Sequence, residues 1–157
     1  MPPISAGSAA KGITAPTTTT VPPPPFPGAA TSYPNGAIVR FGTSDYLVLR
    51  MGETGSWLGR GFQGKGIGTA MRQVICAFLI DHVDAQHITS AAFADNPASL
   101  AVSRKTGYTD NGSEPFNRMG KPATLRRIAL DPASLVRYKH ALTVAGLPEF
   151  RESIGLG

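Results

Sequence analysis

A ten-residue loop, GRGFQGKGIG from Gly59 to Gly68, has the composition of an anion-binding loop. It contains five glycines and Lys65, and it leads directly into an apolar run with helical spacing. Glycine this dense lets the backbone approach an anion closely, and the N–H groups at the start of a helix attract negative charge. The stretch therefore predicts a site for a phosphate-bearing ligand.

Two common nucleotide-binding motifs fit this loop only in part. Residues 59–65 satisfy GxxxxGK, but Gly66 stands where a triphosphate loop needs a hydroxyl to hold magnesium. GRGFQG also satisfies the GxGxxG of a dinucleotide fold, which requires an acidic residue at the end of the next strand. Asp81 and Asp84 instead lie at the end of the expected helix. Neither a nucleoside triphosphatase nor a dinucleotide enzyme is favoured.

The third pattern is QGKGIG, residues 63–68, of the form Gln/Arg-x-x-Gly-x-Gly/Ala. Successive N–H groups in such a loop can hold a pyrophosphate without a metal. About thirty residues later, ADNPASLAVSRKTGYTDNG contains Asn-x-x-Ser and then Lys-x-Gly-Tyr. Together the two motifs resemble the GNAT superfamily of acetyl-CoA-dependent N-acyltransferases. The stretch ETGSWLGRGFQGKGIGTA is similar to the branch that includes ribosomal-protein N-terminal acetyltransferases.

This resemblance implies acetyl-CoA as cosubstrate, with no metal. Backbone amides of the loop would hold the pyrophosphate, and Lys65 would add charge beside it. Two strands, around Ser56–Leu58 and Thr89–Phe93, would part to leave a slot in which the pantetheine pairs like an extra strand. Asn96 would hydrogen-bond the pantetheine or the acetyl carbonyl. The expected cofactor-binding residues are Gln63, Gly64, Lys65, Gly66, Ile67, Gly68, Thr69 and Asn96.

The implied chemistry is direct attack of a neutral amine on the thioester. Ser99 or Tyr108 would protonate the departing thiolate, and Glu53 would accept the amine proton directly or through water. Each residue also has a structural interpretation: Glu53 as an exposed turn residue, Ser99 as an ordinary helix residue and Tyr108 as core. The acceptor would be a primary amine on a small molecule or at a protein N-terminus.

Patterning indicates how the chain positions these residues. We predict strands at 43–51 and 52–58, a helix from Ile67 to about His82, and a buried strand at 87–93. A second helix would be capped by Asn96 and end at Gly107, with a strand beginning at Tyr108. A last strand over 123–131 and a helix over 131–142 complete an α/β or α+β domain. The resemblance implies a GNAT-type mixed sheet flanked by helices.

Composition separates a tail from this domain. Residues 1–37 are rich in proline and threonine and carry one charged side chain, Lys11, so they are expected to be disordered. The single cysteine, Cys76, lies in an apolar run and is expected to be a buried thiol. The net charge of +5 is dispersed, which favours a small polyanionic ligand over nucleic acid. With neither a leader nor a membrane span recognisable, we expect a soluble cytoplasmic protein.

The resemblance covers roughly Met51–Asp131. The family fold normally begins with a strand, two helices and two further strands, and here the tail and one strand take that space. We therefore expect residues 38–157 to form a GNAT domain truncated at its N-terminus, with apolar surface that favours self-association. Two functions follow: an N-acetyltransferase, or a non-catalytic CoA-binding or protein-interaction remnant of one.

Overall fold

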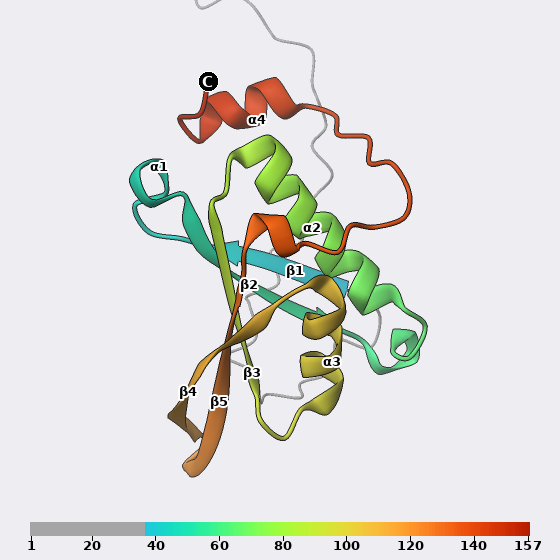
Figure 1. Ribbon diagram of the computed structural model, residues 1–157, viewed down its shortest axis with the longest axis vertical. Helices are drawn as coiled ribbons and strands as arrows, with labels where there is room; N and C mark the ends of the chain where they lie inside the picture. The colour runs from blue at the N-terminus through green and yellow to red at the C-terminus, as the bar shows by residue number, and fades with distance from the viewer. Residues whose placement is uncertain (1–36) are drawn as a thin grey trace, which may run out of the picture.

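Residues 37–157, which the computed structural model describes, form a five-stranded mixed sheet with helices against it (Figure 1). The strands lie in the order β1-β2-β3-β5-β4. Strands β2 and β3 are parallel, and the other neighbours are antiparallel. In chain order the elements are β1 (Ala37–Gly42), α1 (Tyr46–Leu49), β2 (Met51–Leu58), α2 (Ile67–Val83), β3 (His87–Phe93), α3 (Pro97–Thr106), β4 (Thr109–Arg118), β5 (Lys121–Leu130) and α4 (Leu147–Ser153). The expected α/β class, a mixed sheet flanked by helices, is confirmed.

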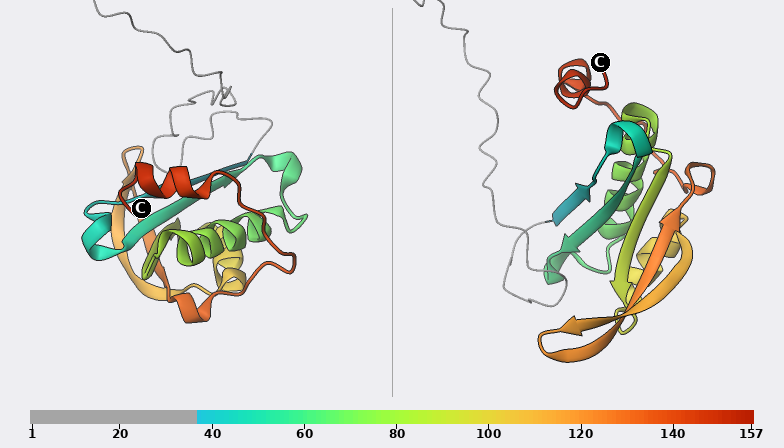
Figure 2. Two further views of the ribbon diagram at one scale, coloured as in Figure 1. Left: turned by 90° about the horizontal axis from the view of Figure 1, so that it is seen from above. Right: turned by 90° about the vertical axis from the view of Figure 1, so that its left-hand side faces the viewer.

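Helices α2 and α3 lie against one face of the sheet (Figure 2). Alternate residues of β3 and β5 point into this layer, because successive side chains of a strand face opposite sides. The buried residues of α2 fall on one stripe that meets them. The resulting core cluster consists of Cys76, Leu79, Val83, Ala85, Ile88, Tyr108, Ile128, Leu130 and Leu156.

The structure confirms the predicted elements around α2 and α3. Helix α2 and strand β3 occupy the predicted segments, and β2 covers the expected strand at 52–58. Asn96 caps α3 through a bond from the Ser99 backbone N–H to its side-chain oxygen. Gly107 ends α3 with φ at 107°, a conformation that glycine adopts without strain. Strand β5 confirms the predicted last strand.

The predicted strand over 43–51 is wrong except at Met51. This segment contains α1, flanked by Asp45 and Arg50 in left-handed conformations that interrupt an extended chain. The Tyr46 hydroxyl donates a hydrogen bond to the Val83 carbonyl at the end of α2. Tertiary contact therefore overrides the strand propensity of this aromatic and β-branched run.

The predicted helix over 131–142 is also wrong. Asp131 caps only a single 3₁₀ turn, Pro132–Ser134, and the chain then runs without regular structure to Gly146. The Val136 N–H bonds to the Thr106 carbonyl, and Arg137 pairs with Asp81 on α2. These contacts hold the segment across the helices, and α4 begins only after Gly146.

The predicted tail, residues 1–37, lies outside the described residues except for Ala37, where β1 begins. Between residues 37 and 157, no helix is long and apolar enough to cross a bilayer.

Candidate functional site

The glycine-rich loop joins the end of β2 to the start of α2. Gly64 and Gly66 have φ of 73° and 77°, so both occupy left-handed conformations that glycine tolerates best. Gly66 is the N-cap of α2, and no side chain caps the helix. The first N–H groups of a helix have no intrahelical partner, so those at the start of α2 remain available to an anion.

Two contacts fix this loop against its neighbours. The Gln63 side-chain amide donates to the Leu58 carbonyl at 2.9 Å, which ties the loop to the last residue of β2. A Cβ at Gly68 would lie 3.7 Å from both Leu58 and Val102, so the first turn of α2 sits between β2 and α3. The loop is therefore held beside the end of β2, while Lys65 is exposed beside it.

The two parallel strands of the sheet, β2 and β3, separate toward the end that carries this loop. Strands β2 and β3 pair only from Met51–Thr54 with His87–Ser90. Beyond that point β2 is paired with β1 alone and β3 with β5 alone, and the ribbons diverge (Figure 1). The facing backbone edges of 55–58 and 91–93 can therefore accept an extended chain in the manner of an added strand. We call the point where pairing ends, at Thr54 and Ser90, the fork.

The predicted acid candidates lie on the helix side of the sheet. Ser99 is half-buried in the first turn of α3, where its backbone is held by Asn96 and by the Ser103 hydroxyl. Asn96 thus uses its side-chain oxygen as a helix cap. Tyr108 is 4% exposed, and its hydroxyl lies 2.8 Å from Thr54 Oγ1.

Tyr108 is part of the core, and its hydroxyl is enclosed by core residues. Its hydroxyl also lies 3.4 Å from Cys76 Sγ. Burial raises the pKa of Tyr108 well above its usual range, since the phenolate would lose its hydration. Burial likewise raises the pKa of the Cys76 thiol. Both groups therefore keep their protons at neutral pH.

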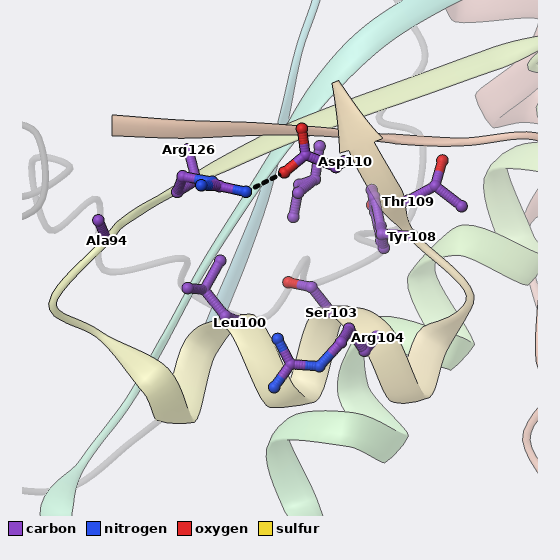
Figure 3. Close-up of a pocket in the computed structure, with 9 residues that line it drawn as sticks. Ala94, Leu100, Ser103, Arg104, Tyr108, Thr109, Asp110 and Arg126 are labelled. Atoms are coloured by element: carbon purple, nitrogen blue, oxygen red, sulfur yellow. Dashed lines mark hydrogen bonds and ion pairs between the residues drawn. The ribbon is translucent and has the colours of Figure 1, made fainter. Parts of the chain in front are cut away.

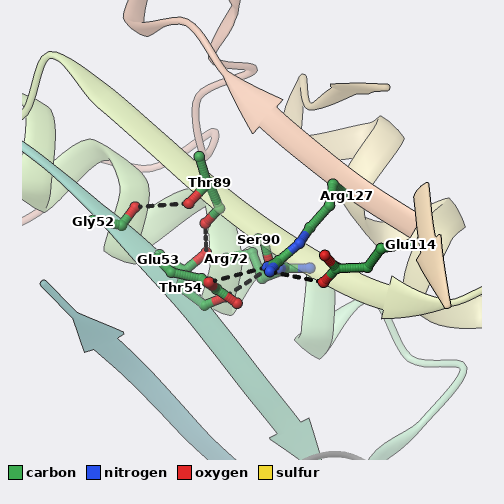
Figure 4. Close-up of polar contacts among 8 residues, drawn as sticks. All are labelled: Gly52, Glu53, Thr54, Arg72, Thr89, Ser90, Glu114 and Arg127. Atoms are coloured by element: carbon green, nitrogen blue, oxygen red, sulfur yellow. Dashed lines mark hydrogen bonds and ion pairs between the residues drawn. The ribbon is translucent and has the colours of Figure 1, made fainter. Parts of the chain in front are cut away.

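Glu53 lies on the opposite face of the sheet, because it precedes the inward-facing Thr54. Glu53 Oε2 pairs with Arg127 Nη1 at 3.3 Å, and Arg127 Nη2 contacts Glu114 Oε1 at 2.9 Å (Figure 4). All three side chains are more than a third exposed. Sequence analysis did not anticipate Arg127 or Glu114 as neighbours of this site, because both residues lie far along the chain from Glu53.

A further residue that sequence reasoning missed is Arg72. It is buried on α2, and its guanidinium reaches Ser90 on β3 and Ser103 on α3. The sequence pattern that could have identified Arg72 is its position four residues before Cys76. Residues i and i+4 share a helix face, so a buried Cys76 predicts that Arg72 also faces the core.

A pocket of about 190 Å³ opens between α3 and the β4–β5 strands (Figure 3). Of the predicted site residues only Tyr108 lines it, and no loop residue does. Its rim carries the Arg126–Asp110 ion pair and Arg104. In the described part of the chain, no group of three or more His, Cys, Asp or Glu side chains could hold a metal ion.

Comparison with known proteins agrees with this geometry. Residues 31–109, half of the chain, match the model of the acetyltransferase (GNAT) domain. A crystal structure described as a probable acetyltransferase superposes with a TM-score of 0.57 at 23% identity, covering 60% of this chain and 54% of that one. A chimera of Vibrio cholerae spermidine N-acetyltransferase SpeG and hSSAT gives 0.57 at 16% identity, covering 62% and 60%. A GNAT acetyltransferase from Streptococcus pneumoniae gives 0.56 at 14% identity, covering 60% and 58%.

At these identities the superpositions show a shared fold, and the chain spans 54% to 60% of the length of these three structures. The domain match over half of the chain shows the family of the protein. The chain belongs to the GNAT acetyltransferase family, whose members use acetyl-CoA as cosubstrate.

Proposed function

We propose that this protein is an N-acetyltransferase that moves an acetyl group from acetyl-CoA to a primary amine by direct attack. The observation that carries this proposal is the placement of the uncapped start of α2 beside the end of β2, at the open end of the slot that begins at the fork of β2 and β3. A pyrophosphate cradle and a slot for an extended amide chain are thereby adjacent. Acetyl-CoA has both a pyrophosphate and an extended chain with amide groups, so it matches the two features together.

The loop and the strand edges would share the binding of this cosubstrate. Backbone N–H groups from Gly64 to Thr69 would face the pyrophosphate, with the positive end of the α2 dipole behind them. The Gln63 N–H already donates to the Arg60 carbonyl, so Gln63 would support the loop through its side chain. Lys65, exposed beside the loop, would add a positive charge. The side-chain amide nitrogen of Asn96 would be the donor toward the pantetheine, since its oxygen already caps α3.

The acceptor amine would arrive from the face of the sheet that carries Glu53. An α-amino group costs about 1.4 kcal/mol to deprotonate at pH 7, and a lysine roughly 4 to 5, so a base matters more for the latter. Glu53 is partly exposed and paired with Arg127, so an incoming ammonium would displace the guanidinium to reach it. We propose Glu53 as the group that receives the amine proton.

Ser99 is the better candidate for the group that protonates the leaving thiolate. It lies in the first turn of α3 and is half-buried, whereas the Tyr108 hydroxyl is enclosed with Thr54 and Cys76.

A second function is a CoA-binding protein without catalysis. The ion pair between Glu53 and Arg127 favours this second function, because the guanidinium is already paired with the carboxylate that would have to act as the base. Binding would then depend on the loop and the slot alone.

Calorimetric titration of the full chain with acetyl-CoA, using ATP and NAD as controls, tests both functions. Turnover would be followed as thiol release with spermidine, an amino acid and a peptide carrying a free N-terminus. Selective binding with release of thiol that weakens in Glu53→Gln supports the transferase. Selective binding without turnover supports the second function, and a folded sample that does not bind acetyl-CoA contradicts both.

A further inference from the structure

Arg72 is a buried cation with no acidic partner among the described residues. It lies near the start of α2 and is 3% exposed. None of the ion pairs found in residues 37–157 includes it, and its Nε has no hydrogen-bond partner there. Burying a charge without a counterion is costly, and apolar replacements of buried charges are often neutral or stabilising. Stability alone therefore gives a weak reason for an arginine here.

The guanidinium joins three elements of the fold. Its Nη1 donates to Ser103 Oγ on α3 at 2.9 Å, and its Nη2 donates to Ser90 Oγ on β3 at 2.5 Å. Its Cζ also lies 5.1 Å from the centre of the Tyr108 ring. A planar guanidinium presents its donors in a fixed fork, so it sets the distance between the two serines and α2.

Both serines also donate hydrogen bonds to residues of the candidate site. Ser90 Oγ donates to the Thr54 carbonyl at 2.7 Å, and these two residues are the last pair before β2 and β3 diverge (Figure 4). Ser103 Oγ donates to the Ser99 carbonyl at 2.9 Å, in the first turn of α3. Arg72 is thus linked to the fork through the Ser90 hydroxyl and to the first turn of α3 through the Ser103 hydroxyl.

We propose that Arg72 is a positioning residue that sets the opening of the slot between β2 and β3 and holds the start of α3 against it. This inference rests on the proposed binding of acetyl-CoA. It concerns the pantetheine part of the cosubstrate, because the fork is the closed end of the slot in which that chain would lie. The pyrophosphate loop is held separately, by Gln63 and by the glycine conformations.

The experiment compares Arg72→Met and Arg72→Lys with Arg137→Met as a matched control. Arg137 also contacts α2, but through Asp81 near the end of the helix away from the loop. Affinity is measured by calorimetry for acetyl-CoA and for adenosine 3′-phosphate 5′-diphosphate, the half of CoA that lacks pantetheine. Circular dichroism and thermal unfolding establish that each variant is folded.

Arg72→Met should weaken acetyl-CoA binding by about tenfold or more, which corresponds to about 1.4 kcal/mol. It should leave the affinity for the nucleotide within about twofold of the wild type, a selectivity that general loosening of the fold would not produce. Arg72→Lys should resemble Arg72→Met, since an ammonium cannot bridge both serines in the same geometry. Arg137→Met should change neither affinity.

Unchanged acetyl-CoA affinity in folded Arg72→Met, or an equal loss for both ligands, would overturn the inference. Where Arg72→Met fails to fold, Ser90→Ala takes its place, because it removes only the hydroxyl between Arg72 and Thr54 and should give the same selective loss. A wild-type chain that does not bind acetyl-CoA overturns the proposed function and this inference together. Wild-type binding with an unaffected variant overturns this inference alone.

Discussion

Gly66 offers a direct test of the pyrophosphate cradle through its replacement by glutamate. Its φ is 77°, and a Cβ at this position would have no atom within 4 Å. Gly66→Glu therefore meets no steric obstacle in the free protein. The left-handed conformation costs an ordinary residue about 1 to 2 kcal/mol of stability. That cost is the same with or without ligand while the loop keeps its shape.

The effect on binding comes from charge. A carboxylate about 5 Å from a phosphate oxygen repels each unit of negative charge by about 0.8 kcal/mol at a dielectric constant of 80 and about 3 at 20. A pyrophosphate that carries two charges is then disfavoured by roughly 2 to 7 kcal/mol. The Kd for acetyl-CoA should therefore rise by at least about 20-fold.

The control is Gly120→Glu in the turn between β4 and β5. Gly120 has φ of 80° and open space at its Cβ position, so it adds the same charge and the same strain far from the loop. Calorimetry with acetyl-CoA and thermal unfolding should show similar losses of stability in the two variants and loss of binding in Gly66→Glu only. Gly66→Ala, which carries strain without charge, should bind within about threefold of wild type if the amides alone hold the anion. Equal affinity of Gly66→Glu and Gly120→Glu would remove the loop from the site.

Three further predictions concern the core behind the site. Gly107→Ala should cost about 2 to 5 kcal/mol of unfolding free energy, because φ is 107° and the new Cβ would clash with the Ser134 carbonyl oxygen. A loss of stability no greater than that of Gly120→Ala in urea titration would contradict this. Because burial raises the pKa of Tyr108, the native state holds that proton more tightly than the unfolded state, so its contribution is complete below about pH 10 and is lost as the pH rises above it. Tyr108→Phe should lower the unfolding free energy by about 1 kcal/mol at pH 7 and should reduce the loss of stability at alkaline pH. An alkaline loss identical to that of the wild type would refute its assignment to Tyr108. Cys76, fully buried with a raised pKa, should react with a thiol reagent at pH 8 roughly a hundredfold more slowly in the native state than in denaturant, whereas rapid native labelling would place it at the surface.

The parts of the fold that were predicted correctly are those with local causes. Helix α3 has its cap and its terminating glycine within its own sequence, at Asn96 and Gly107. Strand β3 is a short run of small and β-branched residues that fits a buried position. The errors over 43–51 and 131–142 lie where distant partners decide the conformation. The Tyr46 hydroxyl donates to the Val83 carbonyl, 37 residues away, and no local sequence pattern predicts that contact.

The glycine loop, the helix that follows it and the second motif could be predicted from local sequence. The reason is that backbone conformation at Gly64 and Gly66 and capping at Asn96 depend on near neighbours. The partners of the buried and charged side chains depend instead on the folded arrangement of distant segments. Arg72 meets Ser90 and Ser103, which follow it by 18 and 31 residues, and Arg127 meets Glu53 across 74 residues. Such contacts form only when the sheet brings separate segments together. The loop could therefore be read from the chain, whereas the fork and its arginine required the fold.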